Sequence, residues 1–167
     1  RKAAERIGIS SRLYLPSNIE VEQALRSYQQ LYGGSQHQSH LRRLRETALL
    51  VMRSLETYYP RLVGPVLDGT ADRYSRVSLH LFNDPPDAVA MQLQEQGFLF
   101  RQEQRRIRWH DGSYRNIPLL VADANGTAIE MALFNNIDLR QAPPSPVDGK
   151  PQKRAPLAEV EGLLAGA

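Results

Sequence analysis

The sequence reads LVGPVLDGTA over residues 62–71 and SRVSL over residues 75–79. Apolar residues lead into Gly64, which predicts a short strand that ends at this glycine. A Gly-Thr-Ala turn follows at residues 69–71. Residues 77, 79 and 81 are apolar and residues 78 and 80 are polar, which is the period-two pattern of a half-buried strand. We therefore expect two strands here, separated by a glycine-rich turn.

Helices are predicted on both sides of this stretch. A capping box of Ser17 and Glu20 starts a first helix, which ends at the glycine pair 33–34. A longer helix with an apolar stripe is expected over residues 40–58, and Pro60 stops it. After the second strand, Asn83-Asp84 is expected to cap a helix that begins at Pro85 and ends at Gly97.

Four further strands and a terminal helix complete the prediction. Strands over residues 98–103 and 105–109 are expected to pair, and strands over 117–121 and 128–134 are joined through Asn125-Gly126, a strong hairpin signal. Five prolines in residues 140–156 predict an extended segment lying over the domain, followed by a short helix at 157–164. This order indicates an α+β fold, with helices packed on a mixed sheet. We assign residues 1–134 to one domain and residues 135–167 to a Pro-rich C-terminal extension.

Residues 62–79 resemble the signature of the DNA polymerase β-like nucleotidyltransferase superfamily. In that signature a glycine motif is followed, after a spacer, by two acids that alternate with apolar residues on a strand. Here ten residues separate Pro65 from Arg76, and the Gly-Thr-Ala run lies between them. The family's third acid lies on a later strand, and residues 128–132 supply Glu130. The resemblance covers residues 40–134 and is closest to a degenerate proteobacterial branch.

The chemistry of that family explains both the pattern and its defects here. Two acids spaced i, i+2 on a strand face the same side, where they hold the two metal ions of nucleotidyl transfer. In this chain Arg76 and Ser78 occupy the two acid positions, and Pro65 follows the glycine without a hydroxyl or N–H. The resemblance thus implies a bacterial pseudoenzyme with impaired catalysis and no metal site, in which Glu130 is a vestigial or residual catalytic acid.

The resemblance also implies where a nucleotide would bind and what would surround it. The expected nucleotide-binding residues are Gly64, Gly69, Thr70, Arg76 and Ser78. We expect the strands at 77–81 and 128–134 to be neighbours, with the helix before Pro60 packed on their sheet. Arg76 is then expected to form an ion pair with Glu130, because an isolated carboxylate gains from a cation.

Two other functions remain open. An active transferase would need Mg²⁺ held by displaced acids, namely Asp68, Asp72 or Asp84 together with Glu130. A binding module for RNA or protein would act through the Pro-rich tail and a basic patch interleaved with aromatic residues. The basic patch comprises Arg101, Arg105, Arg106 and Arg108, with Trp109, Tyr114 and Arg115 close by.

The histidines have simpler interpretations. His37 and His40 have a spacing that suits a shared metal, but a surface position at a helix entry is favoured. His80 faces the same side as Arg76 and Ser78. It is interpreted as a hydrogen-bonded, semi-buried histidine in preference to a base or a phosphate ligand.

The amino-acid composition excludes several kinds of functional site and cellular location. The chain has no cysteine, which excludes disulfides, thiolate zinc sites and a cysteine nucleophile. A net charge of +3 suits an anionic ligand, but an ordinary solvated surface is the favoured explanation. No apolar run reaches the roughly 20 residues of a membrane helix, and no secretory signal is visible. We expect a cytoplasmic location and no membrane partner. The missing initiator Met predicts that the chain is cut from a longer one.

Overall fold

The computed structural model describes residues 34–166 of the chain, so the helix predicted from Ser17 to Gly33 lies outside the described residues. The described part has four α-helices: α3 (Gly34–Ser54), α4 (Pro65–Asp68), α5 (Ala88–Glu95) and α6 (Leu157–Ala165). Two short 3-10 helices, η2 (Glu56–Tyr58) and η3 (Asn136–Leu139), complete the helical segments. No helix within residues 34–166 combines the length and the apolar character needed to cross a bilayer.

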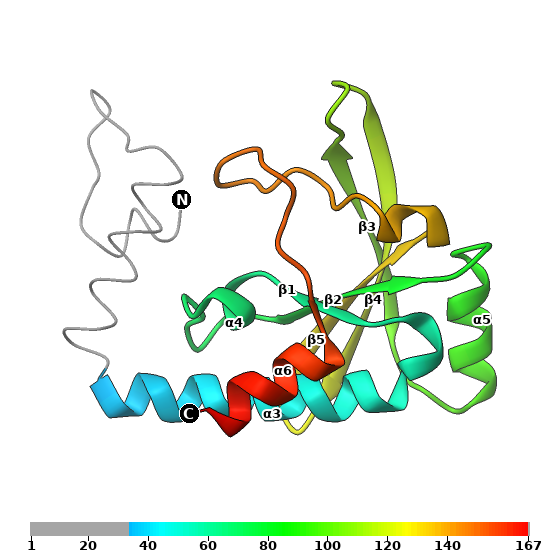
Figure 1. The fold of residues 1–167 in the computed structure, drawn as a ribbon. Coiled ribbons are helices and arrows are strands. Elements are labelled where there is room, and N and C mark those ends of the chain that lie inside the picture. Colours follow the sequence, from blue (N-terminus) through cyan, green and yellow to red (C-terminus); the bar gives the residue numbers. More distant parts are fainter. Residues whose placement is uncertain (1–33, 167) are drawn as a thin grey trace.

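One six-stranded mixed sheet forms the centre of the molecule (Figure 1). Its spatial order is β3-β4-β5-β2-β1-β6. The strands are β1 (Arg61–Val63), β2 (Val77–Phe82), β3 (Arg101–Arg108), β4 (Tyr114–Ala124), β5 (Thr127–Phe134) and β6 (Ala155–Pro156). Only β2 and β5 run parallel, and the other neighbours are antiparallel. The predicted α+β class and mixed sheet are confirmed, as is the predicted contact between residues 77–81 and 128–134.

The two faces of the sheet differ in what covers them. Odd-numbered residues of β2 and β5, such as Leu79 and Met131, pack with Met52 of α3 and Val160 of α6 in the main core. Even-numbered positions of β2 and β5 face the other side, where Phe82 and other apolar side chains form a smaller cluster. The helix before Pro60, α3, therefore packs on one face of the sheet as expected. A different segment covers the opposite face.

That cover is an irregular segment, which we call the strap (residues 141–153). It leaves η3, crosses the sheet and returns through β6 into α6, as the orange trace in Figure 1 shows. Within the strap, Gln152 N donates to Pro143 O at 2.8 Å and Ser145 N donates to Lys150 O at 2.7 Å. These bonds fold it into a closed loop, so the predicted extended segment over the domain is confirmed in position and is more structured than expected.

Three elements differ between the prediction and the structure. Residues 101–108 form the single strand β3, which pairs with β4. The predicted pairing of 98–103 with 105–109 is wrong because an edge strand exposed on both faces carries no apolar alternation. Residues 65–68 form the short helix α4, which the sequence did not predict, although the preceding strand ends at Gly64 as expected. Finally, α5 begins at Ala88, since the Asp84 carboxylate accepts from Asn136 N at 3.0 Å and caps no helix.

Candidate ligand-binding cavity

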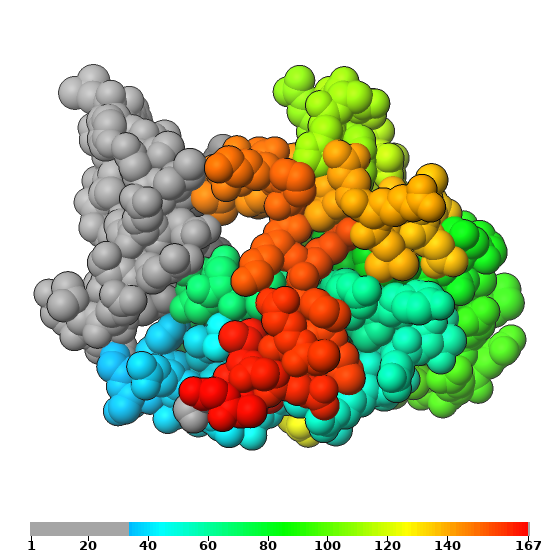
Figure 2. All heavy atoms as spheres, viewed as in Figure 1, coloured from blue at the N-terminus to red at the C-terminus, as the bar shows by residue number. Residues whose placement is uncertain are grey.

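A cavity of about 820 Å³ lies between the strap and the sheet face opposite α3. Its floor is built by β2, β5 and β4, its walls by β3 and the Gly64–α4 turn, and its roof by the prolines of the strap. Figure 2 shows the orange strap standing clear of the green α4 segment below it, with the opening between them. Apolar side chains such as Ile117 and Leu119 share the lining with charged ones. This mixture of an apolar floor and a few polar groups is typical of small-molecule sites.

Gly64 shapes one wall of the cavity. Its backbone has φ 77° and ψ −157°, a combination that side-chain-bearing residues rarely adopt. The chain thereby reverses from β1 into α4 directly beside β2, and a Cβ on Gly64 would lie 3.7 Å from Ser78 Oγ. Gly69 ends α4 in the left-handed region, with φ 91°. Both predicted glycines therefore lie at turns, but only Gly64 lines the cavity.

Glu130 lies on the cavity floor, opposite Ser78 in the β2–β5 register. Its side chain is 7% exposed, and both of its oxygens are occupied by arginines. Arg105 binds it with two hydrogen bonds, of 2.8 and 2.6 Å, and Arg76 donates to Oε1 at 3.2 Å. The predicted ion pair of Arg76 with Glu130 is confirmed. The hydrogen bond to Glu130 raises the pKa of Arg105 further.

The predicted basic patch is divided by the alternation of β3. Arg101 and Arg105 share the cavity face, where Arg101 donates to Glu103 at 3.1 Å and Glu103 also lies 3.4 Å from Arg76. Arg106 lies over the ring of Tyr114, 4.0 Å from its centroid. Trp109 is buried beneath Arg115, at 3.7 Å. The arginines therefore do not form one continuous surface with free aromatic faces.

His80 forms the other polar group of the floor. It is 6% exposed, and its Nδ1 accepts from Arg154 Nε at 3.0 Å, which confirms the predicted hydrogen-bonded histidine. Arg154 also donates to Asp138 O at 2.6 Å and lies over the rings of Phe82 and Phe134. Burial, together with the charges of Arg154 and Arg105, lowers the pKa of His80 to about 3.

The other candidate residues hold loops together. The Asp68 carboxylate accepts from Thr70 N at 3.0 Å and Thr70 Oγ1 at 2.6 Å, and Asp72 accepts from Tyr74 N at 2.7 Å. His37 Nε2 contacts Gly69 O at 3.1 Å, and His40 Nε2 contacts Asp72 O at 3.4 Å. Within residues 34–166, no group of three His, Asp or Glu residues comes close enough to hold a metal ion.

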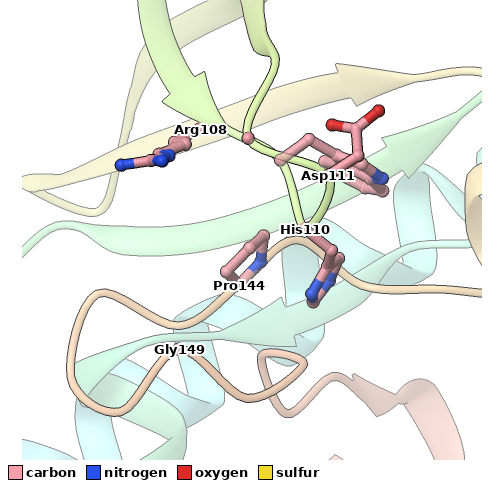
Figure 3. A pocket seen from close by; sticks show the side chains of 7 residues that line it. Arg108, His110, Asp111, Pro144 and Gly149 are labelled. Atoms are coloured by element: carbon pink, nitrogen blue, oxygen red, sulfur yellow. The ribbon is translucent and has the colours of Figure 1, made fainter.

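A second, more open pocket of about 480 Å³ lies where the tip of the β3–β4 hairpin meets the strap (Figure 3). His110 Nε2 contacts Ala142 O at 2.8 Å and joins the two segments. Arg108 and Asp111 point in different directions in Figure 3 and do not converge on a common point. This contact supports the strap from its far side.

The sequence prediction missed two features: Arg154, which contacts His80, and the strap, which covers the cavity. Arg154 sits in a Pro-rich segment without hydrophobic periodicity, so no local pattern distinguishes it from the neighbouring Lys153. A useful signal was available in His80, because a polar residue at a buried strand position needs a hydrogen-bond partner from elsewhere. No family model, curated protein or solved structure matches the chain.

Proposed function

We propose that this chain is a catalytically impaired protein of the DNA polymerase β-like nucleotidyltransferase fold, and that it binds a nucleotide in the strap-covered cavity without a metal ion. The order of elements supports the fold. Helix α3 precedes β1, the Gly64 turn and α4 follow, and β2 returns antiparallel beside β1. β5, which carries the third acid of the resemblance, lies parallel to β2. The resemblance implies that β2 and β5 are neighbours and that the helix before Pro60 packs on their sheet, and both features support the proposal.

The arginine contacts of Glu130 carry the proposal. A carboxylate that serves a divalent cation needs oxygens free to coordinate it, and usually other carboxylates beside it. Here Arg105 and Arg76 together occupy both oxygens of Glu130. Ser78, its direct partner across the β2–β5 register, has no negative charge to contribute. Two guanidinium groups thus contact Glu130, at the position where the family would bind metal ions.

The same arginines are suited to hold a phosphate. Guanidinium groups bind phosphate oxygens through planar, charge-assisted hydrogen bonds. The side chain of Arg105 remains half exposed while it binds Glu130, so some of its donors face solvent. Lys153 of the strap also lines the cavity, together with the carboxylates of Asp68, Glu130 and Asp148. The positive charge is therefore concentrated at Glu130, where Arg105 and Arg76 both contact one buried carboxylate.

Glu130→Gln separates metal-free binding from metal-dependent transfer. Titration calorimetry with ATP, GTP, CTP and UTP is done in the presence of a chelator, and pyrophosphate release is measured with Mg²⁺ or Mn²⁺. We expect nucleotide binding in chelator and no turnover above background for the wild-type chain. Glu130→Gln removes a negative charge and frees donors of Arg105, so we expect binding that is equal or a few-fold tighter. Metal-dependent turnover that Glu130→Gln abolishes would contradict the proposal and favour displaced acids.

A matched pair of arginine variants locates the phosphate. Arg105→Gln removes the guanidinium from the cavity floor, and we expect the Kd for nucleotide to rise about tenfold or more, as for other charge-assisted phosphate contacts. Arg101→Gln changes the same strand at an exposed arginine that pairs with Glu103, so we expect less than a twofold change. Equal effects of the two variants would show that the charge of β3 acts at long range and that the cavity is not the site.

The alternative of an RNA-binding hairpin receives less support. Arg106 stacks on Tyr114 while Arg105 pairs with Glu130 on the other face of β3, so the basic patch is not one surface. Trp109, which would be its strongest stacking residue, is covered by Arg115. We therefore place the ligand in the cavity.

A further inference from the structure

His80 presents one ring nitrogen to the cavity. The alternation of β2 places it on the cavity face, two residues after Ser78, and it forms part of the cavity lining. Its Nδ1 is engaged by Arg154 Nε at 3.0 Å. Among residues 34–166 the ring makes no second hydrogen bond, so Nε2 is the nitrogen left to meet a ligand.

Arg154 determines which tautomer His80 adopts. A guanidinium only donates hydrogen bonds, so Nδ1 must accept and the ring proton must reside on Nε2. Arg154 is fixed in turn by its bond to Asp138 O and by its position over Phe82 and Phe134, at 4.8 and 5.3 Å. Burial lowers the pKa of Arg154 to about 10, so it still carries its protons at neutral pH. Arg154 is thus a positioning residue for His80.

The surroundings of His80 keep the ring uncharged. Arg154 lies against it, Arg105 approaches from β3, and Arg61 stands opposite it in the β1–β2 register. The Asp138 carboxylate faces Arg115, at 3.1 Å, and the backbone oxygen of Asp138 faces Arg154. Burial is the main cause that lowers the pKa of His80 to about 3, and the cations around the ring add to its effect. His80 Nε2–H is a neutral donor over the ordinary pH range.

A second donor lies beside it. Arg154 Nη2 is buried and has no hydrogen-bond partner among the described residues. It lies on the same edge of the guanidinium as Nε, which contacts His80. Buried donors without partners are rare in folded proteins and call for an acceptor. Arg154 is not among the residues that line the cavity, so His80 Nε2–H is the donor that a ligand meets.

We propose that the cavity takes a small phosphate monoester, of sugar-phosphate or mononucleotide size, that has an uncharged acceptor atom for His80 Nε2–H. Its phosphate lies beside Arg105 and Ser78. Residues i and i+2 of a strand are about 7 Å apart, so Ser78 and His80 contact two separate parts of one ligand. Inorganic phosphate is too small to reach both. This inference rests on the proposed function, because it places the phosphate at the arginines described above.

Two variants of His80 separate the ligand contact from the contact with Arg154. His80→Asn retains an oxygen near the position of Nδ1 for Arg154, but its side chain is too short to reach the position of Nε2. His80→Gln retains a donor near the position of Nε2. The probes are ribose 5-phosphate, uridine 5′-monophosphate and inorganic phosphate, titrated calorimetrically in chelator.

For the wild-type chain we expect both esters to bind at least tenfold more tightly than inorganic phosphate. His80→Asn should weaken ester binding about tenfold, the usual cost of one lost hydrogen bond that leaves a partner unsatisfied, and leave inorganic phosphate binding unchanged. His80→Gln should retain most of the preference for esters. Thermal unfolding of both variants shows that they are folded at the temperature of the titration.

Two-bond ¹H–¹⁵N spectra of the imidazoles test the tautomer without a ligand. The His80 signals are assigned by their absence in His80→Gln. We expect a protonated Nε2 and an unprotonated Nδ1, unchanged from pH 8 to pH 5.

The outcomes distinguish this inference from the proposed function. If the nucleoside triphosphates bind but none of the three probes does, the inference fails and the proposed function stands. If neither the triphosphates nor the probes bind, both fail. If phosphate and esters bind equally well, or His80→Asn keeps the preference for esters, only the inference is overturned. A proton on Nδ1 would also overturn it, whatever binds.

Discussion

Glu130 shows how the groups around a buried carboxylate decide what it can bind. With acids at positions 76 and 78 the carboxylate would join a metal site, but with Arg76 beside it the same carboxylate accepts hydrogen bonds from two guanidinium groups. Burial of the carboxylate is then stable because a cation accompanies it.

Stability should fall in acid because His80 is buried and neutral in the folded state. Its pKa is lowered from 6.5 to about 3 on folding, so between these values the unfolded chain binds more protons. The free energy of unfolding therefore rises with pH through this window and decreases as pH falls through it. From pH 8 to pH 5, His80 should account for a loss of about 2 kcal/mol. Urea unfolding at several pH values measures the slope.

His80→Gln is the control for this pH dependence. The variant keeps His37, His40 and His110, so the difference between the two pH profiles isolates position 80. We expect the variant to be flatter between pH 8 and pH 5, whatever its absolute stability. Parallel profiles would mean that His80 titrates similarly in the folded and unfolded chains.

Among the elements, the β4–β5 hairpin shows where a local signal is sufficient. Asn125 and Gly126 have φ of 52° and 77°, the positive values that a two-residue hairpin turn requires. This turn sets the register that places Glu130 opposite Val121 on β4. The sequence alone predicted this turn because its conformation depends only on these two residues.

A pair of glycine variants tests how much this turn contributes. A Cβ on Gly126 would meet nothing within 4 Å, so Gly126→Ala costs only the strained φ, and we expect about 1 kcal/mol of destabilisation. Gly162 lies inside α6, also with open space around it. Gly162→Ala should stabilise the protein by up to about 1 kcal/mol, because alanine favours the helix. Urea unfolding measures the free energy of unfolding of both variants. A result in which both variants are stabilised, or both destabilised, would contradict this account.

The elements that the sequence did not predict share a physical cause. β3 lies at the sheet edge with most residues exposed, so no buried face imposes an apolar alternation on it. The Gly64–α4 turn depends on Arg45 of α3, which donates to Val66 O and Leu67 O at 2.9 and 2.8 Å. Both are determined by contacts from distant segments. By contrast, β2, β5 and most of α3 follow from their own periodicity.

The residues of the candidate site likewise include some whose contacts the sequence predicted and some whose contacts it did not. The Arg76–Glu130 pair was predictable because Glu130 lies on β5 and Arg76 directly precedes β2, which is the neighbour of β5. The second arginine, Arg105, approaches from the edge strand, and Arg154 lies between the strap and β6. Neither arginine is close in sequence to the residue that it contacts, so no local pattern predicts the contact. A sequence pattern therefore predicted the centre of the cavity and missed the residues that cover it.

At the scale of the whole molecule, the segment after β5 belongs to the same packed unit as the sheet. β6 pairs with β1 at one edge, with Leu62 opposite Ala155. Ala155 and Val160 are fully buried in the main core. Arg42 and Arg53 of α3 bond to α6 at 3.2 and 2.8 Å. The sheet edge, the core and the roof of the cavity all depend on residues after 134.

Truncation after Phe134 should therefore prevent cooperative folding. The sequence prediction placed a domain boundary there, and a domain of residues 1–134 would unfold cooperatively on its own. We expect it to lose its cooperative urea transition, because truncation exposes the β1 edge and the α3 surface that β6 and α6 cover. Val160→Ala in the full chain is the graded control, with an expected loss of about 1–3 kcal/mol and a retained transition. If the truncated chain kept nearly full stability, the strap, β6 and α6 would not belong to the cooperative folding unit. The roof of the cavity would then be a segment that can detach from the sheet without unfolding it.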